Sequence, residues 1–242
     1  MRSASRSSAR VLLLVGLAAA AAFLFGLASD RPELRLWTKA APVLCLAAWV
    51  GTRRRDTLGI LITAGLVLSA GGDLLLERGL FLPGLFAFLT AHLAYVGGFV
   101  AQTRRLAAGR AAPVVAWCGL VLAALWPRLG ALEAPVALYV GVIGTMIWRA
   151  AARVGHAGEP TRAEWIGLAG AVAFALSDTL IAVDRFGDPI PGVRWPIMLL
   201  YWAGQTGIAA SVVGTVARFE PPSTGGAAAE TPPPGPTATR PR

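Results

Sequence analysis

The sequence predicts an all-α, polytopic membrane protein with eight transmembrane helices. Of its 242 residues, 55% are hydrophobic and 14% are charged, whereas an average soluble domain has about 25% charged residues. Its mean hydropathy is +0.61, and short basic loops separate its apolar stretches. These observations exclude an ordinary soluble enzyme and a disordered chain, because so apolar a sequence collapses or inserts into a bilayer.

Eight apolar windows are long enough to span, or nearly span, the hydrocarbon core of a membrane. They cover residues 11–29, 38–51, 57–76, 80–102, 111–127, 131–149, 163–183 and 194–217. The first has a longer apolar run than the usual 7–15 or so residues of a signal peptide, so we predict an uncleaved helix. The second is the shortest, and we expect it to recruit residues 34–38 or to lie in a thin part of the membrane.

These windows divide the chain into three parts. We predict a basic cytoplasmic N-terminus over residues 1–10, a transmembrane domain over residues 11–217 and a cytoplasmic tail over residues 218–242. The tail is rich in proline and glycine and has no apolar run that could pack against the helices. Such a composition is typical of a disordered segment.

The net charge of +9 is spread over the loops instead of one helical face. It therefore indicates contact with anionic lipid headgroups, and we expect no nucleic-acid partner. On alternate sides of eight spans, 15 of the 22 Lys and Arg residues fall on the side of the two termini. The excess of positive charge predicts a multi-pass protein of the cell membrane with both termini in the cytoplasm.

Two segments resemble each other when the chain is shifted by 105 residues. Residues 64–76 and 169–181 share six of thirteen positions, and Asp73 falls on Asp178. The resemblance is compatible with a parallel repeat of two four-helix halves. Both aspartates would lie at the same depth, near the outer ends of their helices.

Polar side chains inside these spans are the candidates for function. A carboxylate within a span costs at least about 2.5 kcal/mol on insertion scales, so Asp73 and Asp178 need a partner or a role. The simpler interpretation is that each reaches water or a loop arginine near the interface.

The two cysteines, Cys45 and Cys118, lie within apolar stretches. We interpret them as buried structural thiols, and they are too few for a disulfide framework.

Four further polar residues form two pairs, each on one face of an expected helix. His92 and Tyr95 are spaced i, i+3, and Tyr201 and Gln205 are spaced i, i+4. We predict a polar shaft that narrows inward from the outer leaflet. His92 alone would also fit a hydrogen-bonded core position.

Two cations lie at the outer level of the membrane. Lys39 is the only lysine of the chain, and Arg194 opens the last window. Because every other basic residue among the 22 is an arginine, the one lysine can indicate a need for a compact ammonium group. An ordinary snorkelling role remains the alternative for Lys39.

The same residues lie in runs that resemble the YhhN-like lysoplasmalogenase family of membrane proteins. The similarity covers about residues 36–215, and its runs are SAGGDLLL, FLTAHLAYVGGF, FALSDTLIAVDRF and MLLYWAGQTGIA. Where the family has a Lys-Pro pair, this sequence has Lys39 and, three residues on, Pro42. The resemblance implies eight spans and hydrolysis of the vinyl ether of a lysoplasmalogen, which releases a fatty aldehyde and a glycerophospho-alcohol.

Two carboxylates suit this reaction, because one can protonate the vinyl ether while the other stabilises the resulting cation and accepts a proton from water. We favour Asp178 as the acid in drier surroundings and expect Asp73, beside two glycines, to be more open to water. The expected site comprises Asp73, Asp178, His92 and Tyr201 as catalytic residues and Lys39, Tyr95, Gln205 and Arg194 as substrate-binding residues. We expect no cofactor and no bound metal, with a lysophospholipid and the lipid bilayer as partners.

Two other functions fit the same residues. Paired intramembrane aspartates and a parallel repeat also occur in proton-coupled transporters. A metal-dependent lipid hydrolase could use Asp73, His92 and Asp178 as ligands, although the spacing matches no common metal motif.

Overall fold

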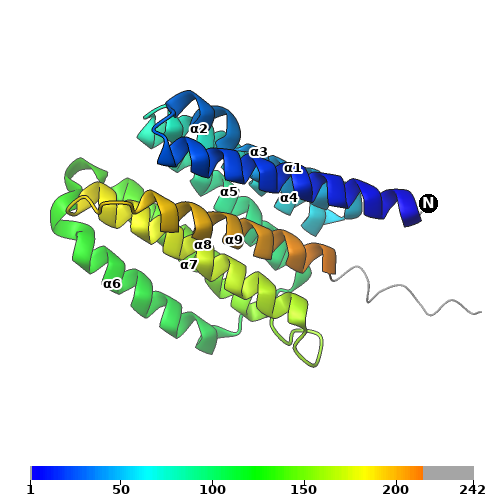
Figure 1. Ribbon diagram of the computed structural model, residues 1–242. Helices are drawn as coiled ribbons and strands as arrows, with labels where there is room; N and C mark the ends of the chain where they lie inside the picture. Colours follow the sequence, from blue (N-terminus) through cyan, green and yellow to red (C-terminus); the bar gives the residue numbers. More distant parts are fainter. Residues whose placement is uncertain (1, 215–242) are drawn as a thin grey trace, which may run out of the picture.

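The computed structural model describes residues 2–214, and this part consists of helices joined by short loops (Figure 1). The α-helices are α1 (Arg2–Ala28), α2 (Pro32–Lys39), α3 (Ala41–Arg53), α4 (Thr57–Glu77), α5 (Phe81–Gln102), α6 (Ala111–Leu129), α7 (Glu133–Arg153), α8 (Arg162–Phe186) and α9 (Arg194–Gly214). Short 3-10 helices, η1 (Ala108–Arg110) and η2 (Gly130–Leu132), precede α6 and α7. The predicted tail, residues 218–242, lies outside the described residues.

Each predicted window overlaps mainly one helix, of which α3 is much the shortest, and α2 is an additional short helix. Pro42 lies at the start of α3, where it has no N–H to continue the hydrogen bonds of α2. This explains why residues 34–38, expected to extend the second window, form a separate helix. The 13 residues of α3 rise about 20 Å, which is less than the ~30 Å thickness of the hydrocarbon core.

Six stretches of the described chain are long and apolar enough to cross a membrane. Five are single helices, and the sixth, Ala108–Arg153, contains both α6 and α7. The prediction of an all-α, multi-pass membrane protein is therefore confirmed.

The helices pack as a bundle in which α4 pairs extensively with α5, and α8 with α9. The two pairs meet directly through α4 and α9. In addition, α3 contacts both α4 and α9, α7 contacts both α5 and α8, and α6 lies outside against α7 and α8. The two ends of the described chain, at the start of α1 and the end of α9, lie at the same end of the bundle (Figure 1).

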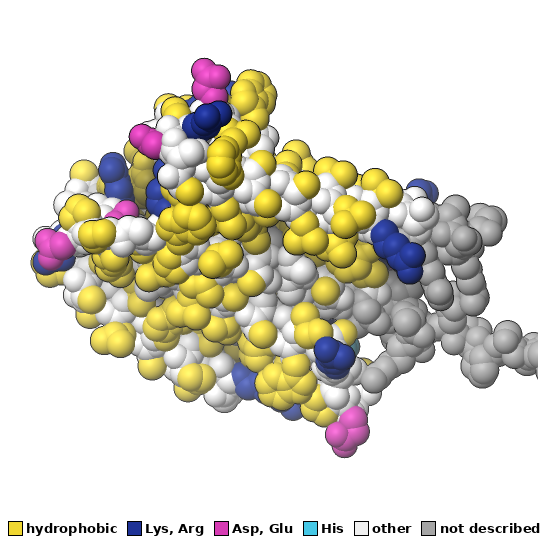
Figure 2. Space-filling view, viewed as in Figure 1, with side chains coloured by type: hydrophobic (Ala, Val, Ile, Leu, Met, Phe, Trp, Pro, Cys, Tyr) yellow, Lys and Arg dark blue, Asp and Glu magenta, His cyan; other side chains and the backbone are white. Residues whose placement is uncertain are grey.

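The outer surface of the bundle is apolar along its length. Figure 2 shows hydrophobic side chains covering the middle of one face, with charged side chains mostly toward its ends. Large exposed side chains such as Leu14, Ile60, Leu93, Leu120 and Leu199 come from five different helices. A surface of this kind is suited to contact with lipid chains.

Close approach of α8 and α9 depends on glycine. A Cβ atom at Gly170 would lie 2.8 Å from the carbonyl oxygen of Gly204 and 2.8 Å from the backbone nitrogen of Ile208. No side chain fits at that distance from rigid backbone atoms, so the helix pair requires glycine here.

Side-chain caps fix the starts of two helices near the bundle end where α9 finishes. The Asp56 carboxylate accepts a hydrogen bond from the Gly59 backbone nitrogen at 3.0 Å and begins α4. A hydrogen bond from the Arg54 guanidinium lowers the pKa of the Asp56 carboxyl, which favours the ionised cap. Thr161 and Glu164 form a reciprocal capping box at the start of α8.

Candidate active site

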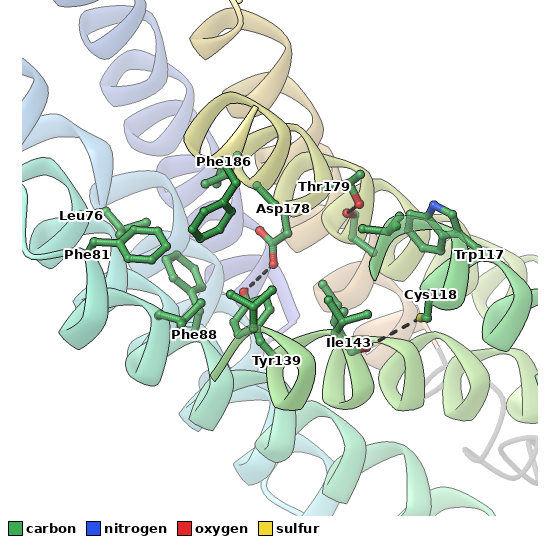
Figure 3. Close-up of a pocket in the computed structure, with 17 residues that line it drawn as sticks. Leu76, Phe81, Phe88, Trp117, Cys118, Tyr139, Ile143, Asp178, Thr179 and Phe186 are labelled. Atoms are coloured by element: carbon green, nitrogen blue, oxygen red, sulfur yellow. Dashed lines mark hydrogen bonds between the residues drawn. The ribbon is translucent and has the colours of Figure 1, made fainter. Parts of the chain in front are cut away.

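Asp178 borders an apolar cavity between α5, α6, α7 and α8 (Figure 3). The cavity has a volume of about 70 Å³. Its walls include Phe81, Phe88 and Phe186 near one end and Trp117 and Cys118 near the other. An aspartate on such a wall is placed beside any apolar chain that enters the cavity.

A tyrosine holds the Asp178 carboxylate. The Tyr139 hydroxyl on α7 donates a hydrogen bond to Asp178 Oδ2 at 2.5 Å. His92 on α5 approaches the same oxygen, with Nε2 at 3.8 Å, and this imidazole is fully buried. Within the described residues, His92 Nε2 has no hydrogen-bond partner. A buried polar atom without a partner, beside a carboxylate, marks a position that can receive a water or substrate oxygen.

Asp73 belongs to a second polar group, which lies deeper in the bundle. Its Oδ2 accepts a hydrogen bond from the Tyr201 hydroxyl on α9 at 2.7 Å. The Tyr95 hydroxyl donates to Gln205 Oε1 at 2.8 Å and lies 3.2 Å from the Ser69 hydroxyl. Gln205 Nε2 is buried and has no hydrogen-bond partner in the described part of the chain.

Aromatic rings connect the two aspartates. Phe174 on α8 is fully buried, and its ring centroid lies 4.8 Å from that of His92 and 5.3 Å from that of Tyr201. The His92 ring in turn meets the Tyr139 ring edge-on at 5.3 Å. The two Asp–Tyr pairs therefore lie on either side of one aromatic cluster, formed by Phe88, His92, Tyr95, Tyr139, Phe174 and Tyr201.

The structure reverses one expectation about the aspartates. Asp73 is the more enclosed, at 2% exposure, whereas the side chain of Asp178 is 12% exposed. The Phe88 ring occupies the space beside Gly72, and although the space beside Gly71 is open, Asp73 itself stays buried. Asp178 is the aspartate that borders the cavity.

The two predicted cations, Lys39 and Arg194, lie at the end of α4, where both contact the carboxylate of Glu77. Arg194 Nη2 donates to Glu77 Oε1 at 2.9 Å and to Oε2 at 2.7 Å. Lys39 Nζ lies 3.4 Å from Oε2, and Arg35 Nε lies 3.0 Å from Oε1. Lys39 is thus an ion-paired, largely buried residue instead of a freely snorkelling one.

Sequence reasoning missed four residues of this region: Arg35, Glu77, Tyr139 and Phe174. Tyr139 carried a usable signal, because the chain has only three tyrosines and all three bond to a polar partner at the site. Glu77 resembled an ordinary interfacial acid at a helix end. Phe174 gave no signal, because one phenylalanine in an apolar helix is typical of any core.

The two cysteines are less buried than the sequence predicts. Cys45 and Cys118 are free thiols, and both are half-buried instead of buried.

Among the residues that the structure describes, no group of three His, Cys, Asp or Glu side chains is arranged to hold a metal ion. The proposed ligands Asp73, His92 and Asp178 are therefore not gathered as one metal site. A larger apolar cavity of about 590 Å³ between α1, α3 and α9 contains none of the predicted site residues.

The apolar bundle and its enclosed carboxylates define a multi-pass membrane protein with a polar site inside the helices. Residues 34–212 match the model of the YhhN family, and the chain belongs to this family. Lysoplasmalogenase TMEM86A of Bos taurus is 36% identical over 207 residues, which cover 79% of this chain and 83% of the relative. Lysoplasmalogenase TMEM86B of Homo sapiens is 39% identical over 173 residues, which cover 69% of this chain and 70% of the relative.

A bacterial relative shows the same similarity over a shorter stretch. The lysoplasmalogenase of Mycobacterium tuberculosis is 38% identical over 157 residues, covering 60% of this chain and 57% of the relative. No solved structure matches the chain. The comparisons confirm the predicted family and the predicted class of protein, a membrane enzyme.

Proposed function

We propose that the chain hydrolyses the vinyl ether bond of lysoplasmalogens by acid–base catalysis with two intramembrane aspartates. The observation that carries this proposal is the Asp178–Tyr139 pair on the wall of an apolar cavity, with a buried imidazole beside it. At about 70 Å³, the apolar cavity has room for a few carbon atoms of the alkenyl chain, and a carboxyl group on its wall suits the acid that this reaction needs. The names of the relatives supply the substrate class.

In the first step, Asp178 as the carboxylic acid transfers its proton to the β-carbon of the vinyl ether. The double bond supplies the electron pair, and an oxocarbenium ion forms at the carbon bound to oxygen. Asp178 suits this role because it borders the cavity and can reach the double bond of a chain that enters it. Tyr139 would orient the carboxyl group through its hydrogen bond.

In the second step, water attacks the oxocarbenium ion and passes a proton to the Asp178 carboxylate, which restores the acid. The hemiacetal then collapses as its C–O bond to glycerol breaks and its hydroxyl proton moves to the leaving oxygen, which gives a fatty aldehyde and a glycerophospho-alcohol. His92 Nε2, which lacks a partner among the described groups, is positioned to bind this water or the ether oxygen. Asp73 in its ionised form would stabilise the cation across the aromatic cluster, with Tyr201 orienting it. Tyr95 and Gln205 would hold the hemiacetal through their linked polar groups.

The headgroup of the substrate would lie at the opposite end of α4 from the Asp56 cap, where Lys39 and Arg194 surround Glu77. The alkenyl chain would extend from there into the cavity beside Leu76, the residue before Glu77. This arrangement places the phosphate at the membrane surface and the vinyl ether among the helices.

The deciding experiment measures aldehyde release by the purified protein from a vinyl-ether lysophospholipid, with the acyl-ester analogue as the control. We expect aldehyde from the vinyl ether and no fatty acid from the ester. Hydrolysis of the ester alone, or no product from either lipid, would refute the proposed function.

We also propose that eight helices cross the membrane, with both termini in the cytoplasm of a cell-membrane protein. The pair α2–α3 supports a crossing in spite of its short second helix. Lys39 contacts Glu77 at one end of the bundle, and Arg54 Nη1 donates to the Val212 carbonyl at the other end, at 2.8 Å. On this basis residues 1–10, 11–217 and 218–242 form the N-terminal, membrane and tail parts.

The packing pattern supports a parallel repeat of four helices. If α1, α3, α4 and α5 correspond to α6, α7, α8 and α9, the extensive pair α4–α5 corresponds to α8–α9. The contacts α1–α3 and α3–α4 then correspond to α6–α7 and α7–α8, and the contact α5–α7 corresponds to α9–α3. The tyrosine partners depart from the repeat, because Asp73 pairs with α9 and Asp178 with α7.

A further inference from the structure

One glutamate gathers three cations from two other segments of the chain. Glu77 ends α4, Arg35 and Lys39 come from α2, and Arg194 begins α9. Arg194 Nη2 and Arg35 Nε lie 2.7 Å and 3.0 Å from the nearest carboxylate oxygens, and Lys39 Nζ lies at 3.4 Å. Both carboxylate oxygens are therefore occupied.

The charges in this cluster do not balance. Among the described residues, three cations contact one buried carboxylate, and the one further acid in contact with them, Asp30, binds Arg35 from the solvent, at 96% exposure of its side chain. The side chains of Arg35, Lys39 and Glu77 are 11%, 10% and 5% exposed, whereas that of Arg194 is 43% exposed. Burial makes uncompensated positive charge costly, and an anion bound beside the exposed Arg194 would offset that cost.

The position of the cluster relates it to the reactive carboxylates. Glu77 lies four residues after Asp73 on the same face of α4, a rise of about 6 Å. Leu76, next to Glu77, borders the cavity that Asp178 faces. A glycerol backbone of similar length separates the vinyl ether of a lysoplasmalogen from its phosphate.

We propose that Glu77 is a positioning residue that holds Arg35, Lys39 and Arg194 as a cradle for the phosphate of the lysolipid. The inference rests on the proposed function and extends it, because it assigns roles to Arg35 and Glu77 and makes α2 a specificity element. Guanidinium groups suit phosphate oxygens, and their planes are fixed here by a shared carboxylate. The cradle selects substrates that carry a phosphate over neutral alkenylglycerols.

The test compares two vinyl-ether substrates, a lysophospholipid and the alkenylglycerol that lacks its phosphate. Wild-type enzyme is expected to prefer the lysophospholipid in kcat/KM. Glu77→Gln keeps the side-chain volume but removes the charge that orients the cations. We expect it to raise KM for the lysophospholipid about 10-fold or more, with kcat little changed and alkenylglycerol hydrolysis unchanged.

Arg194→Gln provides a second variant, because the partly exposed side chain can be replaced without disturbing the core. It should produce the same loss, confined to the phosphate-bearing substrate. Glu33→Gln is the matched control: it removes an exposed carboxylate from α2 and should leave both substrates unaffected. Equal losses on both substrates in Glu77→Gln and Arg194→Gln, or no loss on either, would overturn the cradle.

Measurements of lipid binding test the cradle independently of the proposed hydrolysis. An uncleavable alkyl-ether lysophospholipid and the matching alkylglycerol are used as probes with the purified full chain, whether or not it turns over a vinyl ether. Weaker binding of the phospholipid alone in Glu77→Gln supports the cradle, and unchanged binding contradicts it. Inorganic phosphate is added as a competitor: inhibition means that free phosphate also binds, and its absence means that the cradle accepts phosphate only as part of the lipid.

Discussion

Asp73 and Asp178 each accept a hydrogen bond from a tyrosine, yet they face different surroundings. Asp178 borders the cavity and lies 3.8 Å from an imidazole nitrogen. Asp73 is enclosed among Tyr201, the aromatic cluster and the charges at the end of α4. Of the two aspartates, Asp178 is the one that borders the cavity, so we propose direct proton transfer to carbon for Asp178 and charge stabilisation for Asp73.

Asparagine at either position tests this division. Asp178→Asn and Asp73→Asn keep the volume but remove the acid or the anion, so each should lower turnover by about 100-fold or more. Asp188→Asn is the control, because its side chain is 99% exposed. Aldehyde release is the measurement, and the double variant should be little slower than the slower single one. Full activity in both single variants would contradict the two-aspartate mechanism.

Tyr139→Phe tests whether the orientation of Asp178 contributes to catalysis. The change removes the 2.5 Å hydrogen bond to the carboxylate and leaves the ring contact with His92 in place. Asp178 is proposed to react as a neutral acid, and a hydrogen bond between neutral groups contributes about 0.5–1.5 kcal/mol, so we expect kcat to fall by about 2- to 10-fold.

Thr145→Val is the matched control for that experiment. It removes a hydroxyl from the same helix, but one that binds only the backbone carbonyl of Gly141. Activity should stay at the wild-type level. An equal loss in both variants would point to a general disturbance of α7.

At the scale of the helix, local chemistry explains both what the sequence predicts and what it leaves out. Apolar length alone identifies α4, α5, α8 and α9, and an aspartate or a threonine cap marks where α4 and α8 begin. The boundary between α2 and α3 depends on Pro42, which lies in a window whose composition favours one continuous segment. Close contact between α8 and α9 depends on which face each glycine occupies, and only the packed structure determines that face.

Gly170→Ala should weaken the α8–α9 pair. The added methyl group would lie 2.8 Å from two backbone atoms of α9, which cannot move without separating the helices. Overpacking of this kind costs about 1–3 kcal/mol, and we expect a lower thermal unfolding temperature of the protein in detergent.

Gly141→Ala is the comparison for this variant. A Cβ atom there meets nothing within 4 Å, so the better helix propensity of alanine should leave the unfolding temperature equal or slightly higher. Equal unfolding temperatures for Gly170→Ala and the wild type would mean that the helices have room to separate.

For the whole molecule, the sequence could predict which polar residues lie inside apolar spans, but it could not predict which of them contact each other. Asp73, Asp178, His92, Tyr95, Tyr201 and Gln205 all stand out because polar groups in spans are costly. Their pairing is a long-range property: Tyr201 lies 128 residues from Asp73, and Glu77 lies 117 residues from Arg194. Because no local pattern encodes such contacts, Tyr139 and Glu77 were identified only from the structure.

The number of crossings depends on α3, which alone is too short to span the hydrocarbon core. If α2 and α3 cross together, as the contacts of Lys39 and Arg54 at opposite ends of the bundle support, the count is eight and both termini share one side. The excess of basic residues assigns that side to the cytoplasm. A reporter that works only in the cytoplasm should therefore be active when fused after Phe219.

A set of fusions locates any error in this topology. Fusion after Arg55, in the loop between α3 and α4, should also report the cytoplasm, whereas fusions after Gly79 and Asp188 should be active only with a reporter that works outside it. If α3 does not cross, the loop at Arg55 lies outside and every later fusion inverts, including the one after Phe219. That pattern would leave seven crossings and separate the termini, and α2 and α3 would then lie within the outer half of the membrane.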